Sequence, residues 1–235
     1  DRSIGALRDG LRRLDMANDT LIWFCSDNGG LSGVGADSVG GLRGKKGTMW
    51  EGGLRVPGIV EWPAGIEPRI TAYPAAVMDI FPTLADLLDL PAENMLDPID
   101  GISLVPLFER ELGRRDRPLP FQSGQTTVLI DNDDKILLHR GRGTYELYDL
   151  ASDPAETTDL AARDPERAER LKARVDELAA SVARSMAGED YPQGRVADDG
   201  PGRRFWVDAP AYAPYLDELG TRPEYRRQIQ KARER

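Results

Sequence analysis

Hydrophobic residues in the first ninety positions follow two kinds of spacing. Apolar residues recur every three or four positions over residues 1–14 and again over 79–90, which predicts two amphipathic helices. Residues 20–26 are almost continuously apolar, a pattern typical of a strand that is buried on both faces of a parallel sheet. A second strand is predicted over residues 55–61, which end at a Trp-Pro pair.

The second half of the chain has a different pattern. Short apolar runs alternate with turn residues such as Asn-Asp-Asp and Gly-Arg-Gly, which predicts an antiparallel meander. A long amphipathic helix is then predicted over residues 164–186, followed by a Pro-, Gly- and aromatic-rich tail and a short basic helix. The predicted strands of the meander cover residues 119–122, 126–131, 135–139 and 145–150.

The change of pattern near residue 115 predicts two domains. Residues 1–115 are interpreted as part of an α/β domain, with a mixed sheet covered by helices. Residues 116–235 are interpreted as a subdomain of antiparallel sheet with one long helix and an irregular tail. The 235 residues are 40% hydrophobic, which is enough apolar material for a core and excludes general disorder.

Charge and composition exclude several functional classes. The 31 basic and 40 acidic residues give a net charge of −9, which argues against a general nucleic-acid binder. No apolar run approaches the ~20 residues that a membrane span needs. His139 and Cys25 are the single histidine and cysteine, so a zinc site built from these residue types is excluded.

Two segments could bind a ligand. Asp27 and Asn28 follow the predicted buried strand, and their oxygens suit a hard cation such as Ca²⁺ or Mg²⁺. On spacing alone, Asp-Asn-Gly-Gly is more simply explained as a turn. Lys46 lies in a glycine-rich segment that lacks the spacing of a phosphate-binding P-loop, although a lysine there can bind an oxyanion.

Taken together, these segments strongly resemble the type I sulfatase (arylsulfatase-like) family. Residues 26–30 read Ser-Asp-Asn-Gly-Gly, and residues 42–57 read Leu-Arg-Gly-Lys-Lys-Gly-Thr-Met-Trp-Glu-Gly-Gly-Leu-Arg-Val-Pro. Three downstream segments match the family in the same order along the chain. They are Asp79-Ile-Phe-Pro-Thr-Leu84, Asp100-Gly-Ile-Ser-Leu104 and Glu146-Leu-Tyr-Asp-Leu150 with Asp153-Pro-Ala-Glu156.

The resemblance implies an alkaline-phosphatase-like fold and hydrolysis of sulfate esters. In that family, a formylglycine made from a Cys/Ser-x-Pro-x-Arg motif attacks sulfur, and a divalent cation, usually Ca²⁺, holds the sulfate. By position, Asp27 and Asn28 match two metal ligands, and Lys46 matches the lysine that contacts the sulfate and the leaving group. Glu51 and Arg55 also match family positions, and we expect them to serve pairing and loop closure.

The chain also departs from the family pattern. It contains no Cys/Ser-x-Pro-x-Arg motif, and the family's paired N-terminal aspartates and active-site histidines have no match. We therefore expect the C-terminal portion of a sulfuric ester hydrolase, inactive alone, with the formylglycine in a missing N-terminal half. Two alternatives stay open: a phosphate or phosphonate ester hydrolase of the same superfamily, and a truncated, non-catalytic binding protein. The compartment stays open, although family members are commonly exported.

Overall fold

The computed structural model describes residues 1–31, 38–91, 93, 95–190 and 205–234. The chain forms two compact units, Asp1–Asp190 and Tyr191–Arg235, and each is described by itself. The domain boundary predicted at residue 115 lies within the first unit and stays a prediction.

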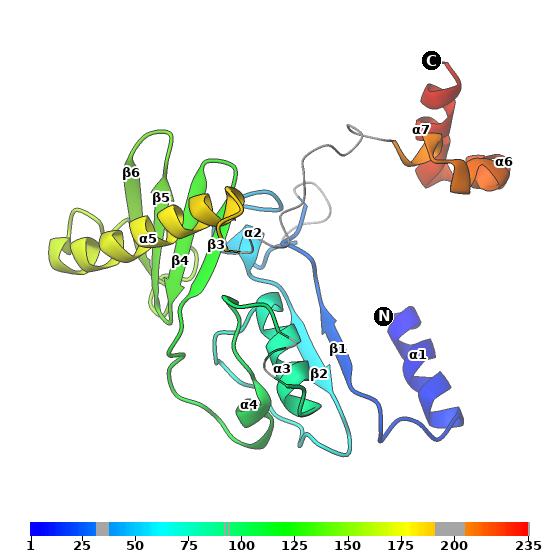
Figure 1. Ribbon diagram of the computed structural model, residues 1–235, viewed down its shortest axis with the longest axis horizontal. Coiled ribbons are helices and arrows are strands. Elements are labelled where there is room, and N and C mark those ends of the chain that lie inside the picture. The colour runs from blue at the N-terminus through cyan, green and yellow to red at the C-terminus, as the bar shows by residue number, and fades with distance from the viewer. Residues whose placement is uncertain (32–37, 92, 94, 191–204, 235) are drawn as a thin grey trace. The chain divides into compact units, whose positions relative to one another are not determined.

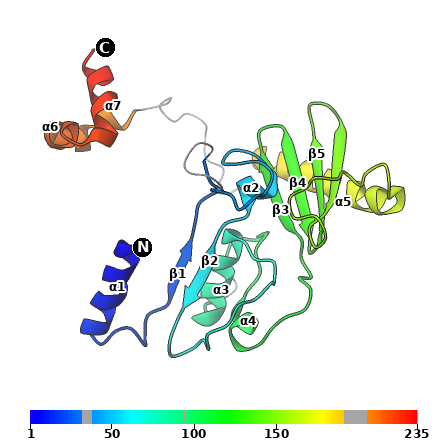
Figure 2. The ribbon, with the colours of Figure 1, turned by 180° about the vertical axis from the view of Figure 1, so that it is seen from behind.

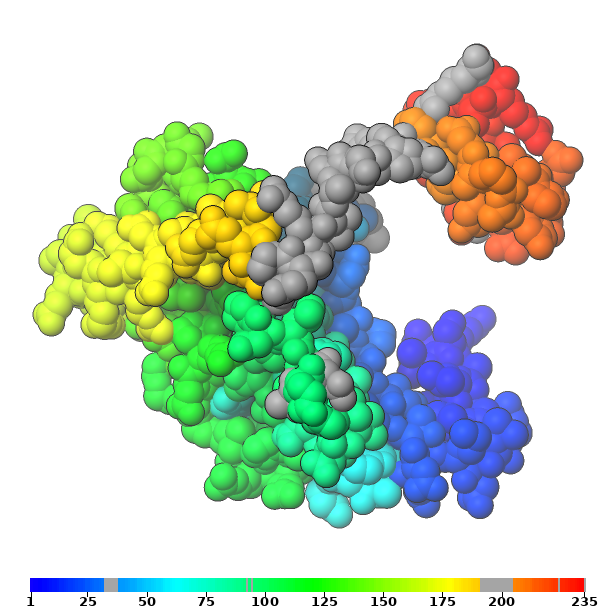
Figure 3. Space-filling model, viewed as in Figure 1, coloured from blue at the N-terminus to red at the C-terminus, as the bar shows by residue number. Residues whose placement is uncertain are grey.

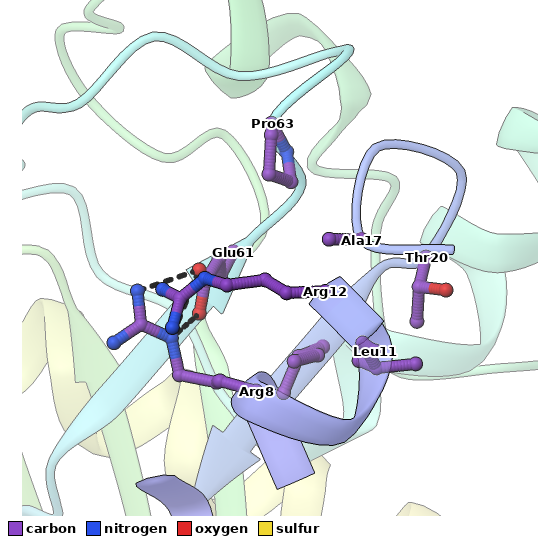
Figure 4. Close-up of a pocket in the computed structure, with 8 residues that line it drawn as sticks. Arg8, Leu11, Arg12, Ala17, Thr20, Glu61 and Pro63 are labelled. Carbon is purple, nitrogen blue, oxygen red and sulfur yellow. Dashed lines mark hydrogen bonds and ion pairs between the residues drawn. The ribbon is translucent and has the colours of Figure 1, made fainter. Parts of the chain in front are cut away.

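The first unit opens with helix α1 (Arg2–Arg13), which confirms the helix predicted over residues 1–14. Strand β1 (Ile22–Cys25) pairs with β2 (Gly58–Glu61), and the two strands run antiparallel. Within the described residues β1 pairs with β2 alone, so the predicted parallel neighbour of this strand is not seen there. The prediction that the strand is buried on both faces is wrong in this structure, because its residues are half-buried or, at Phe24, exposed. The Arg8 guanidinium lies 2.8 Å from the Glu61 carboxylate and joins α1 to β2 (Figure 4).

Three short helices accompany this strand pair. Helix α2 (Glu51–Leu54) lies between the strands in sequence, and α3 (Ile80–Leu87) and α4 (Val105–Glu109) follow β2. Asp79 ends a 3₁₀ turn (Val77–Asp79) just before α3, and its buried carboxylate lies 2.8 Å from the Arg115 guanidinium. This contact ties the start of α3 to the segment that leads into the second sheet.

The second sheet is the meander that the sequence predicts. Its strands have the order β3-β4-β5-β6, and each pair of neighbours is antiparallel. Helix α5 (Pro165–Met186) crosses one face of this sheet (Figures 1 and 2), and Figure 3 shows its yellow atoms over the green strands. The four strands are β3 (Leu119–Ser123), β4 (Thr126–Asp131), β5 (Asp134–His139) and β6 (Thr144–Asp149).

Successive side chains of a strand point to opposite faces of the sheet, and in this sheet both faces are covered by other parts of the chain. The face under α5 is apolar, and its buried residues are Leu129, Ile136, Leu138 and Leu147, packed on Ala168, Leu171 and Val175. The opposite face contains Val128, Leu137 and Tyr148, and it packs against Met49 and Trp50. The segment that carries Lys46 therefore continues into residues that cover the second face of the sheet.

The second unit contains more helix than the sequence predicts. Two 3₁₀ segments, η4 (Trp206–Asp208) and η5 (Pro210–Tyr215), precede α6 (Leu216–Gly220) and α7 (Pro223–Arg233). The Trp206 ring meets the rings of Tyr212 and Tyr225 edge to face, with centroids 5.6 Å apart in both pairs. These aromatic contacts join η4 to η5 and α7, which accounts for part of the regular structure within residues 205–234. None of the described helices is long and apolar enough to span a bilayer.

Candidate active site

Backbone hydrogen bonds bring the two candidate segments together at the end of β1. The Lys46 N–H donates to the Gly30 carbonyl at 2.9 Å, and the Gly29 N–H donates to the Gly53 carbonyl at 3.0 Å. A Cβ on Gly29 would lie 1.8 Å from the Gly52 carbonyl oxygen, and a Cβ on Gly53 would lie 2.1 Å from that of Thr48. Gly29 is thus required because the backbone of the other segment passes too close for a side chain, and Gly53 because its own segment folds back on it.

Lys46 lies in a tight turn that fixes its backbone. The Thr48 N–H and hydroxyl both donate to the Lys45 carbonyl, at 3.0 and 2.8 Å, and the Lys45 N–H donates to the Thr48 hydroxyl oxygen at 3.0 Å. Gly47 has a φ of +84°, a left-handed conformation that favours glycine. The side chains of Lys45 and Lys46 are exposed at this turn.

Asp27 and Asn28 follow β1 after one intervening residue, Ser26. The Asp27 side chain is exposed, Asn28 is half-buried, and the Asn28 carbonyl accepts the Ser26 hydroxyl at 2.9 Å. Their oxygens suit Ca²⁺, but two side chains are fewer than the about six to eight ligands that this ion takes. Within the part of the chain that the structure describes, no group of three or more His, Cys, Asp or Glu residues could hold a metal. The metal role of Asp27 and Asn28 stays a prediction.

The two residues that flank the Lys46 turn bind the same carboxylate on β6. The Glu146 Oε2 atom lies 3.4 Å from an Arg43 nitrogen, 3.2 Å from Trp50 Nε1 and 2.6 Å from the Tyr148 hydroxyl. Burial raises the pKa of Glu146, but hydrogen bonds from Tyr148, His139 and Trp50 and the Arg43 charge outweigh it and leave the pKa below its ordinary value. Glu146 is therefore an ionised acceptor for both flanking residues.

A buried ion cluster lies beneath α2. Lys135 Nζ lies 3.0 Å from Glu51 Oε1 and 2.8 Å from Glu156 Oε1, and the Lys135 and Glu156 side chains are 0% exposed. Glu156 Oε2 also accepts the Glu51 N–H at 2.6 Å. The Arg55 guanidinium lies 2.8 Å from the other Glu51 oxygen, which confirms the pairing expected of these two residues. Burial raises the pKa of Glu156 despite the nearby Lys135 charge.

Comparison with known proteins assigns the family. A family model described as Sulfatase matches residues 1–90. The chain is 32% identical over 194 residues to choline-sulfatase of Rhizobium meliloti, covering 79% of this chain and 34% of that protein. It is 37% identical over 131 residues to steryl-sulfatase of Mus musculus, covering 52% of this chain and 20% of that protein. Residues 1–90 thus form a sulfatase-family segment, and the relatives that match the chain are sulfatases.

Solved structures agree with this assignment. A Bacteroides thetaiotaomicron structure from work on glycosaminoglycan metabolism (BT33336S-sulf) is 26% identical, with a TM-score of 0.64 over 76% of this chain and 42% of its own. The phosphonate monoester hydrolase of Agrobacterium radiobacter is 27% identical, with a TM-score of 0.53 over 86% of this chain and 42% of its own. The chain thus spans between a fifth and about two fifths of the lengths of these four proteins.

Sequence reasoning missed several residues around this candidate site. Glu146 and Glu156 lie within quoted family segments, but the pattern alone gives them no role. Lys135 carries a usable signal, because a lysine at an inward position of an otherwise apolar strand needs a buried partner. His139 also carries no role from the sequence pattern, yet its side chain is only 22% exposed and Nε2 lies 2.8 Å from Glu146 Oε1.

Proposed function

We propose that this chain is the C-terminal portion of a sulfuric ester hydrolase. The observation that carries the proposal is the hydrogen bond from the Lys46 N–H to the Gly30 carbonyl, 2.9 Å long. It joins the backbone of the lysine turn to the segment that contains Asp27 and Asn28, whose oxygens could hold a divalent cation for a sulfate group. The relatives named as sulfatases support the reaction class.

The chemistry explains why these residue types belong together. Hydrolysis of a sulfate ester breaks the bond between sulfur and the leaving oxygen, and negative charge develops on that oxygen. The Lys46 ammonium would stabilise this charge, and an oriented cation does so better than water. Asp27 and Asn28 would supply two oxygen ligands to a divalent cation, such as Ca²⁺, which when bound would neutralise charge on the sulfate.

The nucleophile is proposed to come from elsewhere in the protein. The 235 residues contain no Cys/Ser-x-Pro-x-Arg motif from which formylglycine could be made. The chain also covers only 34% of choline-sulfatase and 20% of the mouse steryl-sulfatase. We therefore propose that a longer protein supplies the nucleophile and the remaining ligands, and that residues 1–235 alone are inactive.

A phosphonate or phosphate ester hydrolase is the second candidate. It is favoured by the 27% identity and TM-score of 0.53 to the Agrobacterium phosphonate monoester hydrolase. Such an enzyme could use the same lysine and the same oxygen ligands, because both reactions move a charged group between two oxygens. The substrate class must therefore be decided by turnover.

A comparison of three esters with one leaving group tests the proposal. The full-length protein is assayed with 4-nitrophenyl sulfate, 4-nitrophenyl phosphate and a 4-nitrophenyl phosphonate monoester. We expect kcat/KM to be highest for the sulfate by about tenfold or more, equivalent to about 1.4 kcal/mol in the barrier. A Lys46→Ala preparation controls for contaminating hydrolases. Preference for the phosphonate would replace the proposal with the second candidate, and no turnover of any ester would favour a binding protein.

A further inference from the structure

We propose that Glu146 is a positioning residue that holds the Lys46 loop, defined as residues 44–49, in its working place. The inference rests on the proposed function, because it assigns Glu146 a role that acts through Lys46. Glu146 lies on β6, about a hundred positions along the chain from the loop, so nothing local in the sequence links the two.

Both ends of the Lys46 loop meet at one oxygen atom. Arg43 directly precedes the loop and Trp50 directly follows it, and their side-chain nitrogens lie 3.4 and 3.2 Å from Glu146 Oε2. The Arg43 guanidinium also stacks 4.2 Å from the centre of the Trp50 ring. The carboxylate therefore closes the loop non-covalently and fixes the distance between its two ends.

Glu146 is itself held firmly in the sheet. Its backbone pairs with Leu137 of β5, and its side chain is 21% exposed. The Tyr148 hydroxyl donates to Oε2 at 2.6 Å, and His139 Nε2 lies 2.8 Å from Oε1. The Arg43 guanidinium makes two further bonds, to the Tyr148 hydroxyl at 2.6 Å and to the Glu156 carbonyl at 3.2 Å. The loop is thus anchored to the sheet rather than to solvent.

A carboxylate fits this position because it only accepts hydrogen bonds. Its Oε2 atom is shared by the Tyr148, Trp50 and Arg43 donors, at 2.6, 3.2 and 3.4 Å, and its Oε1 atom faces His139. The negative charge also balances the Arg43 cation and so favours the closed loop. Since a displacement of about 1 Å at a reacting group can cost about 10²-fold in rate, holding the Lys46 backbone should affect turnover strongly.

Kinetics of paired variants separate positioning from general stability. In the full-length protein acting on 4-nitrophenyl sulfate, we expect Glu146→Ala to lower kcat about 10–100-fold with a smaller change in KM. Trp50→Phe keeps the ring but removes the Nε1 donor, and we expect a smaller loss. Glu146→Gln keeps an acceptor oxygen and should recover part of the activity. Glu177→Ala, at an exposed position of α5, is the control and should change kcat little.

The Lys46→Ala background identifies the route of the effect. If Glu146 acts through Lys46, Glu146→Ala should lower kcat by less than about twofold once the lysine is absent. An equal fractional loss in both backgrounds would show a structural role and overturn the proposal. If Lys46→Ala alone leaves kcat unchanged, the lysine assignment fails, and the positioning role fails with it.

Amide hydrogen exchange tests the anchoring without any use of activity. In the full-length protein, the Lys46 and Thr48 amides should exchange at least about tenfold faster in Glu146→Ala, whereas amides of α5 should not change. Trp50→Phe should shift the same two amides in the same direction. Unchanged exchange at Lys46 and Thr48 would overturn the positioning role even if the protein proves to be a sulfatase.

Discussion

Replacing Lys135 by methionine is expected to destabilise the protein by about 3–5 kcal/mol. Methionine keeps most of the stem volume, so the loss comes from the missing charge rather than from a cavity. The variant leaves Glu51 and Glu156 close together without their shared cation, and the Glu156 side chain is 0% exposed. Urea unfolding of the full-length protein, with the wild type measured in parallel, gives the difference in free energy.

A surface lysine provides the matched control. Lys172 pairs with Glu169 on α5 at 2.7 Å, with side-chain exposures of 30% and 72%. Its replacement by methionine is expected to cost about 0–1 kcal/mol, because exposed ion pairs contribute little. A Lys135→Met cost as small as the control's would mean that the buried carboxylates find other partners, and the account of the cluster would be wrong.

The stability lost in Lys135→Met is expected to depend on pH. Burial raises the pKa of Glu156, so the stability linked to this group is present below the ordinary pKa and is lost as the pH rises through the folded-state pKa. Removal of Lys135 takes away the charge that lowers this pKa, so the pKa rises further. The loss of unfolding free energy in Lys135→Met, relative to the wild type, should therefore be larger at pH 8 than at pH 5. A deficit independent of pH would contradict this argument.

Replacing Lys46 by alanine is expected to lower kcat of the full-length protein by about 10²–10³-fold, and replacing Lys45 to have a much smaller effect. Both side chains are exposed in the same turn, and each variant removes one positive charge. A difference in kcat between the two variants therefore reports the position of the lysine and not the loss of charge. The difference is expected because Lys46, and not Lys45, matches the family's lysine that contacts the sulfate and the leaving group. Steady-state turnover of 4-nitrophenyl sulfate measures both variants.

The stability of the two variants has to be known before their rates are compared. Neither replacement removes a backbone hydrogen bond, so both should unfold at the wild-type urea concentration. Equal losses of kcat in the two variants would show that the wrong lysine has been assigned to the substrate.

Periodicity predicts the local elements of this chain well. The meander, α5 and α1 are confirmed within about two residues at most ends, because the helices have an apolar face and the strands are short apolar runs between clear turn residues. For β1 the apolar run predicts burial on both faces and a parallel neighbour, whereas the strand is half-buried and pairs antiparallel with β2, because such a run does not show which strand lies beside it. The second unit was underestimated, because part of its regular structure depends on contacts between Trp206, Tyr212 and Tyr225 rather than on spacing.

The residues of the candidate site could be predicted from the sequence, but the contacts that place them in space could not. The family motifs indicate Asp27, Asn28 and Lys46, and the hydrogen bond between Lys46 and Gly30 brings their segments together. The contacts that hold this arrangement come from Glu146 and Lys135, on strands about a hundred residues away. Such long-range pairs leave only a weak trace in one sequence, namely a charged residue on the inward face of an apolar strand.

Sulfate release by two proteins side by side tests the central claim most directly. The full-length protein and residues 1–235 alone are each incubated with 4-nitrophenyl sulfate and Ca²⁺, and each has a Lys46→Ala preparation as its control. The account predicts release by the full-length protein that depends on Lys46, and no release above the control by residues 1–235. Lys46-dependent turnover by residues 1–235 alone would contradict the account, because these residues would then contain a complete active site.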